Sequence, residues 1–225
     1  MQAIILAAGM GTRLRSVSPS KPLTLVAGRP LLERIIDNLR AAGVTRPLVV
    51  TGYRGDEVAG VAHAAGAETV HNPDWQRPNG VSVLAAAPHL AGEALLLMAD
   101  HLASPGVYRT VAAAGRADAG LVLGIDRRMG HPWADEADVT RVATRGNRIT
   151  AIGKTLNTYD AHDCGVFLVT PELMDALEPL ADPGLSDGVR ALAARGRAAV
   201  VDISDHDWID IDDPRALAQA EAWTA

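Results

Sequence analysis

Short apolar runs alternate with amphipathic stretches along the first half of the chain. The apolar runs predict buried strands at residues 3–6, 48–51, 68–71 and 94–98. Between them, apolar residues at helical spacing predict helices over residues 30–39, 56–65 and 80–90. Continuous apolar strands that alternate with helices are typical of a parallel sheet covered on both faces. Ligands of such sheets bind beyond the carboxyl ends of the strands, where a glycine-rich loop and Asp100 fall here.

The second half of the chain has a different pattern. Strands are predicted at residues 121–125, 166–169 and 199–203, with a hairpin formed by residues 140–143 and 149–152. Helices are predicted from Pro171, over residues 189–195 and from Pro214, whereas the polar stretch 127–138 is predicted to be a loop. We therefore expect one α/β domain over residues 1–225, with halves at 1–115 and 116–225. Its expected architecture is a Rossmann-like three-layer sandwich with a mixed, mostly parallel central sheet.

Composition excludes several classes of protein. The net charge of −6, from 21 basic and 27 acidic residues, argues against a general nucleic-acid binder. Cys164 is the single cysteine, so an intrachain disulfide is impossible and a reducing cytoplasm fits. The sequence shows neither a signal peptide nor the roughly 20 apolar residues that cross a bilayer. We expect a cytoplasmic protein without membrane insertion.

A glycine-rich segment follows the first predicted strand and is suited to hold a triphosphate. Gly9 and Gly11 bring backbone N–H groups against phosphate oxygens, and Arg13 and Lys21 add cations. No Gly-Lys-Ser/Thr follows at Walker A spacing, and Leu14 replaces the third glycine of a dinucleotide fingerprint. The residues expected to contact a nucleotide here are Leu6, Ala7, Ala8, Gly9, Gly11, Thr12 and Arg13.

Carboxylates at two distant points of the chain form a candidate metal site. Asp100 follows a buried strand, and the alternation along residues 208–212 places Asp210 and Asp212 on one face. Magnesium prefers oxygen ligands and takes one or two carboxylates together with substrate phosphates. Asp212 and Asp213 are equally suited to cap the helix that begins at Pro214. Asp100 is therefore a predicted metal ligand, and the pattern alone leaves its partner open between Asp210 and Asp212.

Residues 77–80 precede a predicted helix and form a third candidate feature. Backbone N–H groups at a helix start can bind a ligand, so Asn79 and Gly80 are candidates for contacting a nucleotide. The alternative is that Asn79 serves as the N-cap of the helix. The two roles are compatible.

Residues 6–14, followed by Pro19-Ser20-Lys21-Pro22-Leu23, resemble the signature of the sugar-phosphate nucleotidyltransferases, L-A-A-G-x-G-T-R-L with a later P-K-P-L. The likeness looks sharper for one branch, the CTP:inositol-1-phosphate cytidylyltransferases, which carry an aspartate-histidine pair, I-G-K and D-T-G. Here the corresponding residues are Asp100-His101, Ile152-Gly153-Lys154 and Asp163-Cys164-Gly165. The resemblance implies a GT-A-like fold of the nucleotide-diphospho-sugar transferase type.

The resemblance also implies roles for individual residues. Arg13 and Lys21 would be the catalytic cations, and Asn79 with Gly80 would contact the base. Trp208-Ile209-Asp210 resembles the family's W-x-D motif, whose aspartate completes the metal site. Asp210 would therefore bind the metal together with Asp100, and the contribution of Asp212 stays open. Lys154 would bind the phosphate of the acceptor. The remaining acceptor-pocket residues would be His101, Cys164 and Gly165, although buried packing is an alternative role for Cys164.

The implied reaction is Mg²⁺-dependent transfer of a nucleotidyl group from an NTP, expected to be CTP, to a phosphorylated small alcohol, expected to be inositol 1-phosphate. A sister enzyme that uses another NTP with a sugar 1-phosphate or phosphocholine is one alternative. A catalytically silent regulator that binds sugar nucleotides is another. Arg13, Lys21, Asp100 and Asp210 are all present, which argues against the silent regulator.

Overall fold

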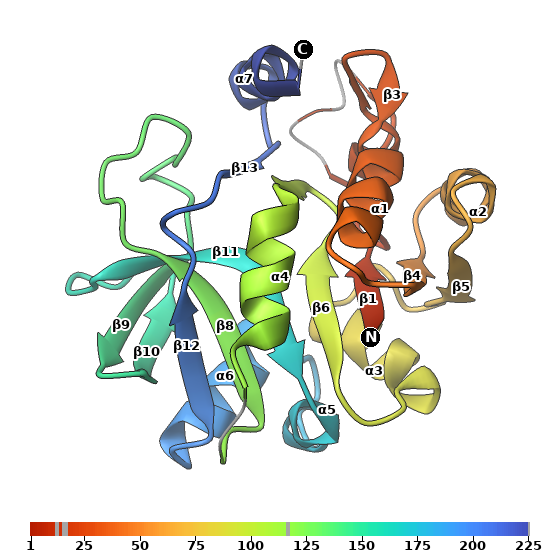
Figure 1. The fold of residues 1–225 in the computed structure, drawn as a ribbon. Coiled ribbons are helices and arrows are strands. Elements are labelled where there is room, and N and C mark those ends of the chain that lie inside the picture. The colour runs from red at the N-terminus through yellow and green to blue at the C-terminus, as the bar shows by residue number, and fades with distance from the viewer. Residues whose placement is uncertain (12–13, 15–17, 116–117, 225) are drawn as a thin grey trace.

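A mixed sheet of nine strands forms the centre of the described part of the chain (Figure 1). The structure is a computed structural model that describes residues 1–11, 14, 18–115 and 118–224. The strand order is β5-β4-β1-β6-β11-β8-β12-β10-β9. The bounds in chain order are β1 (Gln2–Leu6), β4 (Arg46–Thr51), β5 (Glu68–His71), β6 (Ala94–Met98), β8 (Leu121–Asp126), β9 (Arg141–Arg145), β10 (Arg148–Gly153), β11 (Ala161–Val169) and β12 (Ala198–Asp202).

Helices cover both faces of this sheet, so the expected three-layer α/β sandwich is confirmed (Figure 1). Alternate residues of β1 separate two cores: Ile5 packs with one set of helices and Ile4 with the other. The first core includes residues of α1 (Leu31–Ala41), α2 (Gly55–Ala64), α4 (Pro105–Ala113) and α7 (Pro214–Thr224). The second includes residues of α3 (Gly80–Ala86), α5 (Pro171–Leu177) and α6 (Leu185–Ala194). None of the helices in the described part is both long and apolar enough to cross a bilayer.

Three details of the secondary structure differ from expectation. Helix α4 was not predicted, although Pro105 at its first turn and the buried Val107, Tyr108 and Val111 are helical signals. The helix from Gly80 ends as a 3₁₀ turn at Ala87–His89, because Pro88 removes a backbone donor. Helix α6 begins at Leu185, four residues before the expected start.

A short ladder carries the C-terminal carboxylates to the centre of the sheet. Strand β13 (Trp208–Asp210) pairs antiparallel with β7 (His101–Ala103), and the register sets Asp210 opposite His101. The next residue continues the contact, since the Ile211 N–H donates to the Asp100 carbonyl at 2.9 Å. Two segments more than a hundred residues apart in the sequence are thereby adjacent at the carboxyl end of β6.

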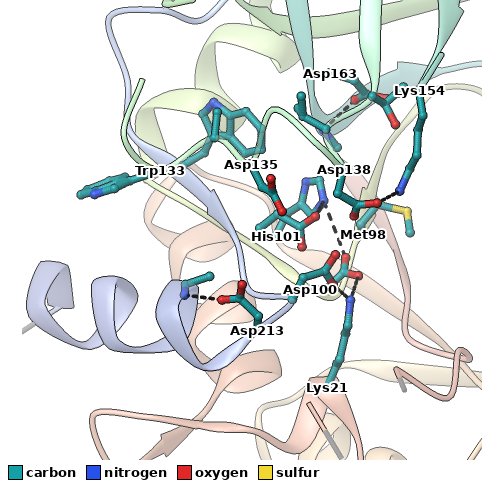
Figure 2. Close-up of a pocket in the computed structure, with 18 of the residues that line it drawn as sticks. Lys21, Met98, Asp100, His101, Trp133, Asp135, Asp138, Lys154, Asp163 and Asp213 are labelled. Atoms are coloured by element: carbon teal, nitrogen blue, oxygen red, sulfur yellow. Dashed lines mark hydrogen bonds and ion pairs between the residues drawn. The ribbon is translucent and has the colours of Figure 1, made fainter. Parts of the chain in front are cut away.

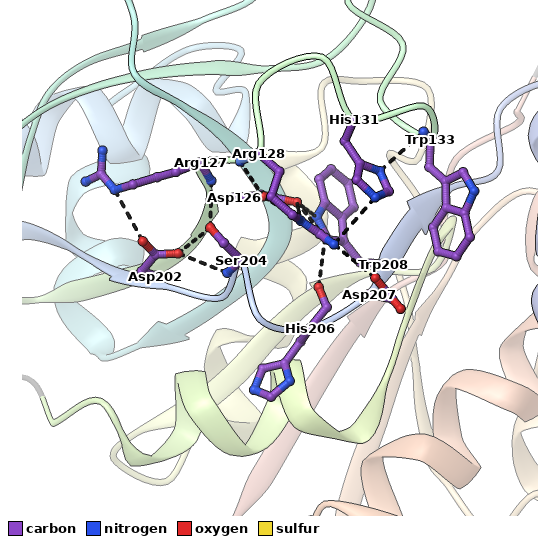
Figure 3. Close-up of polar contacts among 10 residues, drawn as sticks. All are labelled: Asp126, Arg127, Arg128, His131, Trp133, Asp202, Ser204, His206, Asp207 and Trp208. Carbon is purple, nitrogen blue, oxygen red and sulfur yellow. Dashed lines mark hydrogen bonds and ion pairs between the residues drawn. The ribbon is translucent and has the colours of Figure 1, made fainter.

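Trp208, at the start of β13, is tied to the end of β8 by a buried carboxylate (Figure 3). The Trp208 Nε1–H donates to Asp126 Oδ2 at 2.8 Å, and Arg128 donates to both oxygens of the same carboxylate. Arg128 also donates to Asp207 at 3.0 Å. Burial raises the pKa of Asp126, but the hydrogen bonds from Arg128 and Trp208 prevail and hold the pKa below its ordinary value.

We predict that Asp126→Asn lowers the free energy of unfolding by about 2 kcal/mol at pH 7, because it leaves Arg128 without its buried counter-charge. The native carboxyl has the lower pKa, so its stabilisation is present above the unfolded-state pKa of about 3.9 and is lost as the pH falls below it. The deficit of the variant should therefore shrink in urea unfolding at pH 3. Asp175→Asn, at an exposed position of α5, is the control. An equal deficit at both pH values would contradict the prediction.

Candidate active site

The glycine-rich segment after β1 lines a pocket of about 150 Å³. Of the residues predicted to contact a nucleotide, Leu6, Ala7, Ala8, Gly9 and Gly11 line this pocket, together with Asn79. Thr12 and Arg13 lie outside the described residues. The pocket opens beyond the carboxyl ends of β1 and β6, as the sequence pattern predicts for a ligand site.

Lys21 passes directly under the glycine segment. Gly11 has a φ of +58°, and the aliphatic stem of Lys21 fills the space that a Cβ at Gly11 would need. The Lys21 ammonium lies 3.0 Å from Asp100 Oδ2 and forms a second ion pair with Asp212. The Lys21 side chain is only 12% exposed, so packing and charge together fix its position.

A larger pocket of about 310 Å³ adjoins the first (Figure 2). Both pockets are lined by Lys21, Asn79, Met98 and Asp100. The larger pocket also contains the predicted residues His101, Lys154, Gly165 and Asp210. Lys21 and Asp100 therefore stand at the junction of two cavities, which is the geometry that a transfer between two bound substrates requires.

The carboxylates at this junction suit a divalent cation. Ligand atoms of Asp100, His101 and Asp210 lie within 4.8 Å of one another, as do those of Asp138, Asp210 and Asp212. Among the described residues, Asp100 Oδ1 and Asp210 Oδ1 are buried without a hydrogen-bond partner. Burial alone would raise the pKa of Asp100, but the charges of His101 and Lys21 outweigh it and lower that pKa. The donor set is thus anionic, oxygen-rich and suited to a divalent cation.

His101 lies behind these carboxylates. Its Nδ1 donates to the Cys164 carbonyl at 2.9 Å, its Nε2 is 3.4 Å from Asp210 Oδ2, and its ring stacks on Trp208. Burial opposes the charged imidazolium, but the carboxylates of Asp210 and Asp100 prevail and raise the pKa of His101 to about 10. His101 therefore orients Asp210 in addition to facing the larger pocket.

Gly165 lines the larger pocket, and the space left by its missing side chain is occupied by the His101 ring. Its φ is +75°, and a Cβ there would overlap the His101 ring at Nδ1. The neighbouring Asp163 accepts a hydrogen bond from the Gly165 N–H at 2.7 Å, and burial raises the pKa of Asp163 to about 6. The Asp-Cys-Gly segment therefore supports the histidine and contributes one carboxyl to the pocket.

Of three other predicted residues, Cys164 takes the buried position that the sequence offered as an alternative, and Asn79 and Gly80 make contacts that sequence alone did not indicate. The Cys164 side chain is fully buried in the core, where burial raises the pKa of its thiol, and it lines neither pocket. Asn79 lines both pockets but does not cap α3 through its side chain; its Oδ1 accepts the Leu185 N–H at 2.8 Å. Gly80 packs against the backbone of Pro183 and lines neither pocket.

The loop before β9 contributes side chains to the site that the sequence pattern did not indicate. Trp133, Asp135 and Asp138 from this loop line the larger pocket, and Asp138 holds the Lys154 ammonium at 2.6 Å. Asp212, whose contribution to the metal site the sequence leaves undecided, is ion-paired with Lys21 at the junction. The sequence did hint at this role, because the polar stretch contains a tryptophan and several acidic residues. No periodicity, however, indicates where such a loop lies in the fold.

Curated relatives align with nearly the whole of this chain. The bifunctional IPC transferase and DIPP synthase of Rubrobacter xylanophilus is 39% identical over 226 residues, which cover 97% of this chain and 51% of that protein. The CMP-5'-(3-aminopropyl)phosphonate synthase of Streptomyces rubellomurinus is 34% identical, over 98% of this chain and 38% of that protein. The chain thus spans about half or less of the length of these relatives.

Solved structures share the fold. The inositol-1-phosphate CTP transferase from T. maritima superposes with a TM-score of 0.85 at 26% identity, over 98% of this chain and 94% of that one. A UDP-glucose pyrophosphorylase from Acinetobacter superposes with a TM-score of 0.77 at 17% identity, over 98% and 91% of the two chains, a likeness of fold. The expected nucleotide-diphospho-sugar transferase type is confirmed.

A match to a protein-family model identifies the family of the chain. Residues 3–148 match the family described as the MobA-like NTP transferase domain. The matched segment includes the glycine-rich segment, Lys21 and Asp100, and it spans more than half of the 225 residues. The resemblance inferred from the motifs is thereby confirmed, and the chain belongs to the family of MobA-like NTP transferase domains.

Proposed function

We propose that the chain transfers a cytidylyl group from CTP to inositol 1-phosphate and releases pyrophosphate, with Mg²⁺ as its cofactor. One observation carries the proposal: Lys21 and Asp100 stand where a pocket under the glycine segment meets a second, larger pocket. Two relatives support the choice of substrates, since one is named an IPC transferase and the other an inositol-1-phosphate CTP transferase.

The reaction needs few chemical groups from the protein. A phosphate oxygen of the acceptor attacks the α-phosphorus of CTP, and the bond from that phosphorus to the β-phosphate oxygen breaks, so that pyrophosphate leaves with the bonding electrons. The attacking oxygen is already anionic, which makes a general base unnecessary. Catalysis then consists of positioning the two phosphates and neutralising the charge that develops on them.

Lys21 supplies a fixed positive charge at the junction, and Arg13 supplies a second one in this proposal. Asp100 and Asp210 would hold Mg²⁺, with Asp212 close enough to assist. The bound ion would neutralise phosphate charge. Without the metal, the Lys21 ammonium offsets the negative charge of Asp100 and Asp212.

The two substrates occupy opposite sides of the junction in this proposal. The CTP phosphates lie along the glycine segment, and Asn79, which lines both pockets, lies toward the base. Lys154 receives the phosphate of the acceptor, and His101 and Gly165 border the acceptor. Cys164 takes part through its carbonyl, which holds His101.

The proposal is tested by pyrophosphate release from each of the four NTPs, offered with inositol 1-phosphate, glucose 1-phosphate or phosphocholine. We expect the highest kcat/KM for CTP with inositol 1-phosphate. Preference for another pair would reassign the substrates within the family. Absence of pyrophosphate with every pair would refute nucleotidyl transfer.

We predict that Lys21→Met lowers kcat at least a hundredfold, roughly the effect of removing one charge-stabilising donor from an active site. The KM for inositol 1-phosphate should change little, because Lys154 rather than Lys21 receives that phosphate. Pyrophosphate release measures the rate, and thermal melting shows whether the variant is folded. A folded variant with near-normal kcat would rule out the role of Lys21.

Asp100→Asn should weaken metal binding. We expect the Mg²⁺ concentration for half-maximal activity to rise by about tenfold or more, because one anionic ligand is lost. Mn²⁺ binding measured by calorimetry is the readout that does not depend on turnover. The wild-type enzyme should also lose activity in EDTA and recover it when Mg²⁺ is added in excess. Unchanged Mn²⁺ affinity in the variant would remove Asp100 from the metal site.

Gly165→Ala should lower kcat by about tenfold, because the new Cβ overlaps the His101 ring and displaces the group that orients Asp210. Gly196→Ala is a matched control: Gly196 also has a positive φ, +68°, but a Cβ there meets open space. Both variants bear similar backbone strain, so a difference in kcat isolates the overlap with His101. Equal kcat in the two variants would contradict this role of Gly165.

A further inference from the structure

Ser82 lies in the first turn of α3 and lines the smaller pocket, the one of about 150 Å³ under the glycine segment. It is not among the residues that line the larger pocket. The serine is only 5% exposed. What its hydroxyl group can offer to a ligand therefore depends on the few polar groups around it.

Asn72, the residue directly after β5, fixes the polarity of this hydroxyl group. The Asp74 N–H donates to Asn72 Oδ1 at 2.9 Å, and because a backbone N–H can only donate, this bond identifies the oxygen end of the amide. The nitrogen end therefore faces Ser82, and Nδ2 donates to Ser82 Oγ at 3.0 Å. Asn72 is 1% exposed and its own N–H donates to the Thr51 carbonyl at 2.8 Å, so the residue is held in place.

The hydrogen of the Ser82 hydroxyl group has no acceptor in the part of the chain that the structure describes. A hydroxyl group has one hydrogen and two lone pairs, and Asn72 occupies one of the lone pairs. Thr224 of α7, by contrast, donates to the carbonyl four residues before it, the usual partner of a helical hydroxyl group. A buried donor needs an acceptor, so the hydrogen of Ser82 is available to a ligand in the smaller pocket.

The order of the strands separates Ser82 from the charged end of the smaller pocket. Along the sheet the strands follow the order β5-β4-β1-β6. Asp100, with its partner Lys21, lies beyond the end of β6, whereas Asn72 follows β5 and is bonded to Thr51 at the end of β4. Ser82 is bonded to Asn72, and α3 packs against β4 and β5. A triphosphate beside Lys21 and the glycine segment therefore directs its nucleoside toward Ser82.

We propose that Ser82 donates its hydroxyl hydrogen to N3 of the cytosine ring, and that Asn72, by donating to the serine oxygen, makes CTP preferred over UTP. The inference rests on the proposed function and assigns the choice of pyrimidine to two residues. Cytosine N3 carries a lone pair on the edge of the base that proteins read, whereas uracil N3 carries a hydrogen. With UTP two donors would face each other and the Ser82 hydrogen would stay unpaired, which weakens binding.

The first variant removes the donor. Pyrophosphate release by the full chain is measured with CTP and with UTP, in the presence of Mg²⁺ and inositol 1-phosphate. We expect Ser82→Ala to lower kcat/KM for CTP roughly tenfold, the effect of losing one hydrogen bond. The kcat/KM for UTP should stay within about twofold, because Ser82 makes no hydrogen bond to uracil N3.

A nucleotide analogue locates the bond on the base. In 3-deaza-CTP a C–H group replaces N3, so the wild type should use it roughly tenfold less well than CTP. Ser82→Ala should use CTP and the analogue about equally well, because the bond between Ser82 and N3 is absent in either case. The same preference for CTP over the analogue in wild type and variant would place the bond elsewhere and overturn the inference.

Changing Asn72 should reverse the polarity. In Asn72→Asp the side chain still accepts the Asp74 N–H, but it cannot donate to Ser82 and instead accepts the Ser82 hydrogen. A lone pair of Ser82 then faces the base and suits the N3–H of uracil. We expect the ratio of kcat/KM for CTP to that for UTP to fall below the ratio in Ser82→Ala. Adding Ser82→Ala to this variant should remove the gain for UTP.

Thermal melting shows whether Asn72→Asp folds; if it does not, Ser82→Ala and the analogue decide the question. Ser104→Ala is the matched control, because Ser104 precedes α4, lines neither pocket and makes no side-chain cap. It should leave kcat/KM for both nucleotides unchanged.

Equal losses for CTP and UTP in Ser82→Ala would assign the hydroxyl group to the ribose or the phosphates and overturn the inference, with nucleotidyl transfer intact. A wild type that uses UTP as well as CTP would also overturn it. If the wild type releases no pyrophosphate with any NTP and acceptor, the proposed function fails, and the inference fails with it.

Discussion

Mutual repulsion among carboxylates at the end of β6 is the constraint on which the site depends. Asp100, Asp210 and Asp212 converge there, and like charges at such distances repel one another unless a cation lies among them. The Lys21 ammonium and the imidazole of His101 provide that compensation from two sides. Two cationic side chains therefore offset part of this negative charge before any metal or triphosphate arrives, as the proposed reaction would require.

The fold creates this convergence by joining distant segments at one edge. β1 and β6 are parallel neighbours, so the glycine segment and Asp100 emerge side by side. The β7–β13 ladder then carries Asp210 to His101, and the buried bond from Trp208 to Asp126 fixes the start of β13. Gly165 admits the His101 ring where a side chain would exclude it. Each step depends on backbone pairing or buried packing, which is more rigid than contacts between surface loops.

The parts of the site that depend on strand pairing were easier to predict from the sequence than the parts that depend on loops. Strand periodicity predicted the central strands, and their carboxyl ends indicated where Gly9, Gly11 and Asp100 would lie. The contact between Asp210 and His101 was harder to predict, because it depends on the register of a three-residue strand. Cys164 was misleading for a related reason: in an extended segment neighbouring side chains point to opposite faces, so Gly165 borders the pocket while the thiol enters the core. Helix α4 could have been predicted, because Pro105 at its start and the helical spacing of Val107, Tyr108 and Val111 are typical of a helix.

The wall formed by residues 127–140 could not be predicted, because its position is set by contacts with α7, with Tyr159 and with the segment before β13. The ion pair between Asp138 and Lys154 shows what such a wall offers. Lys154 is 54% exposed in that pair, and exposed ion pairs stabilise a protein by roughly 0–1 kcal/mol. In the proposed reaction, an acceptor phosphate would compete with Asp138 for the exposed Lys154 more readily than it could rearrange the buried charges around Lys21. In the proposed reaction, side chains on the exposed loop can therefore change the acceptor preference. The buried charges around Lys21, which would carry out the transfer, stay in place.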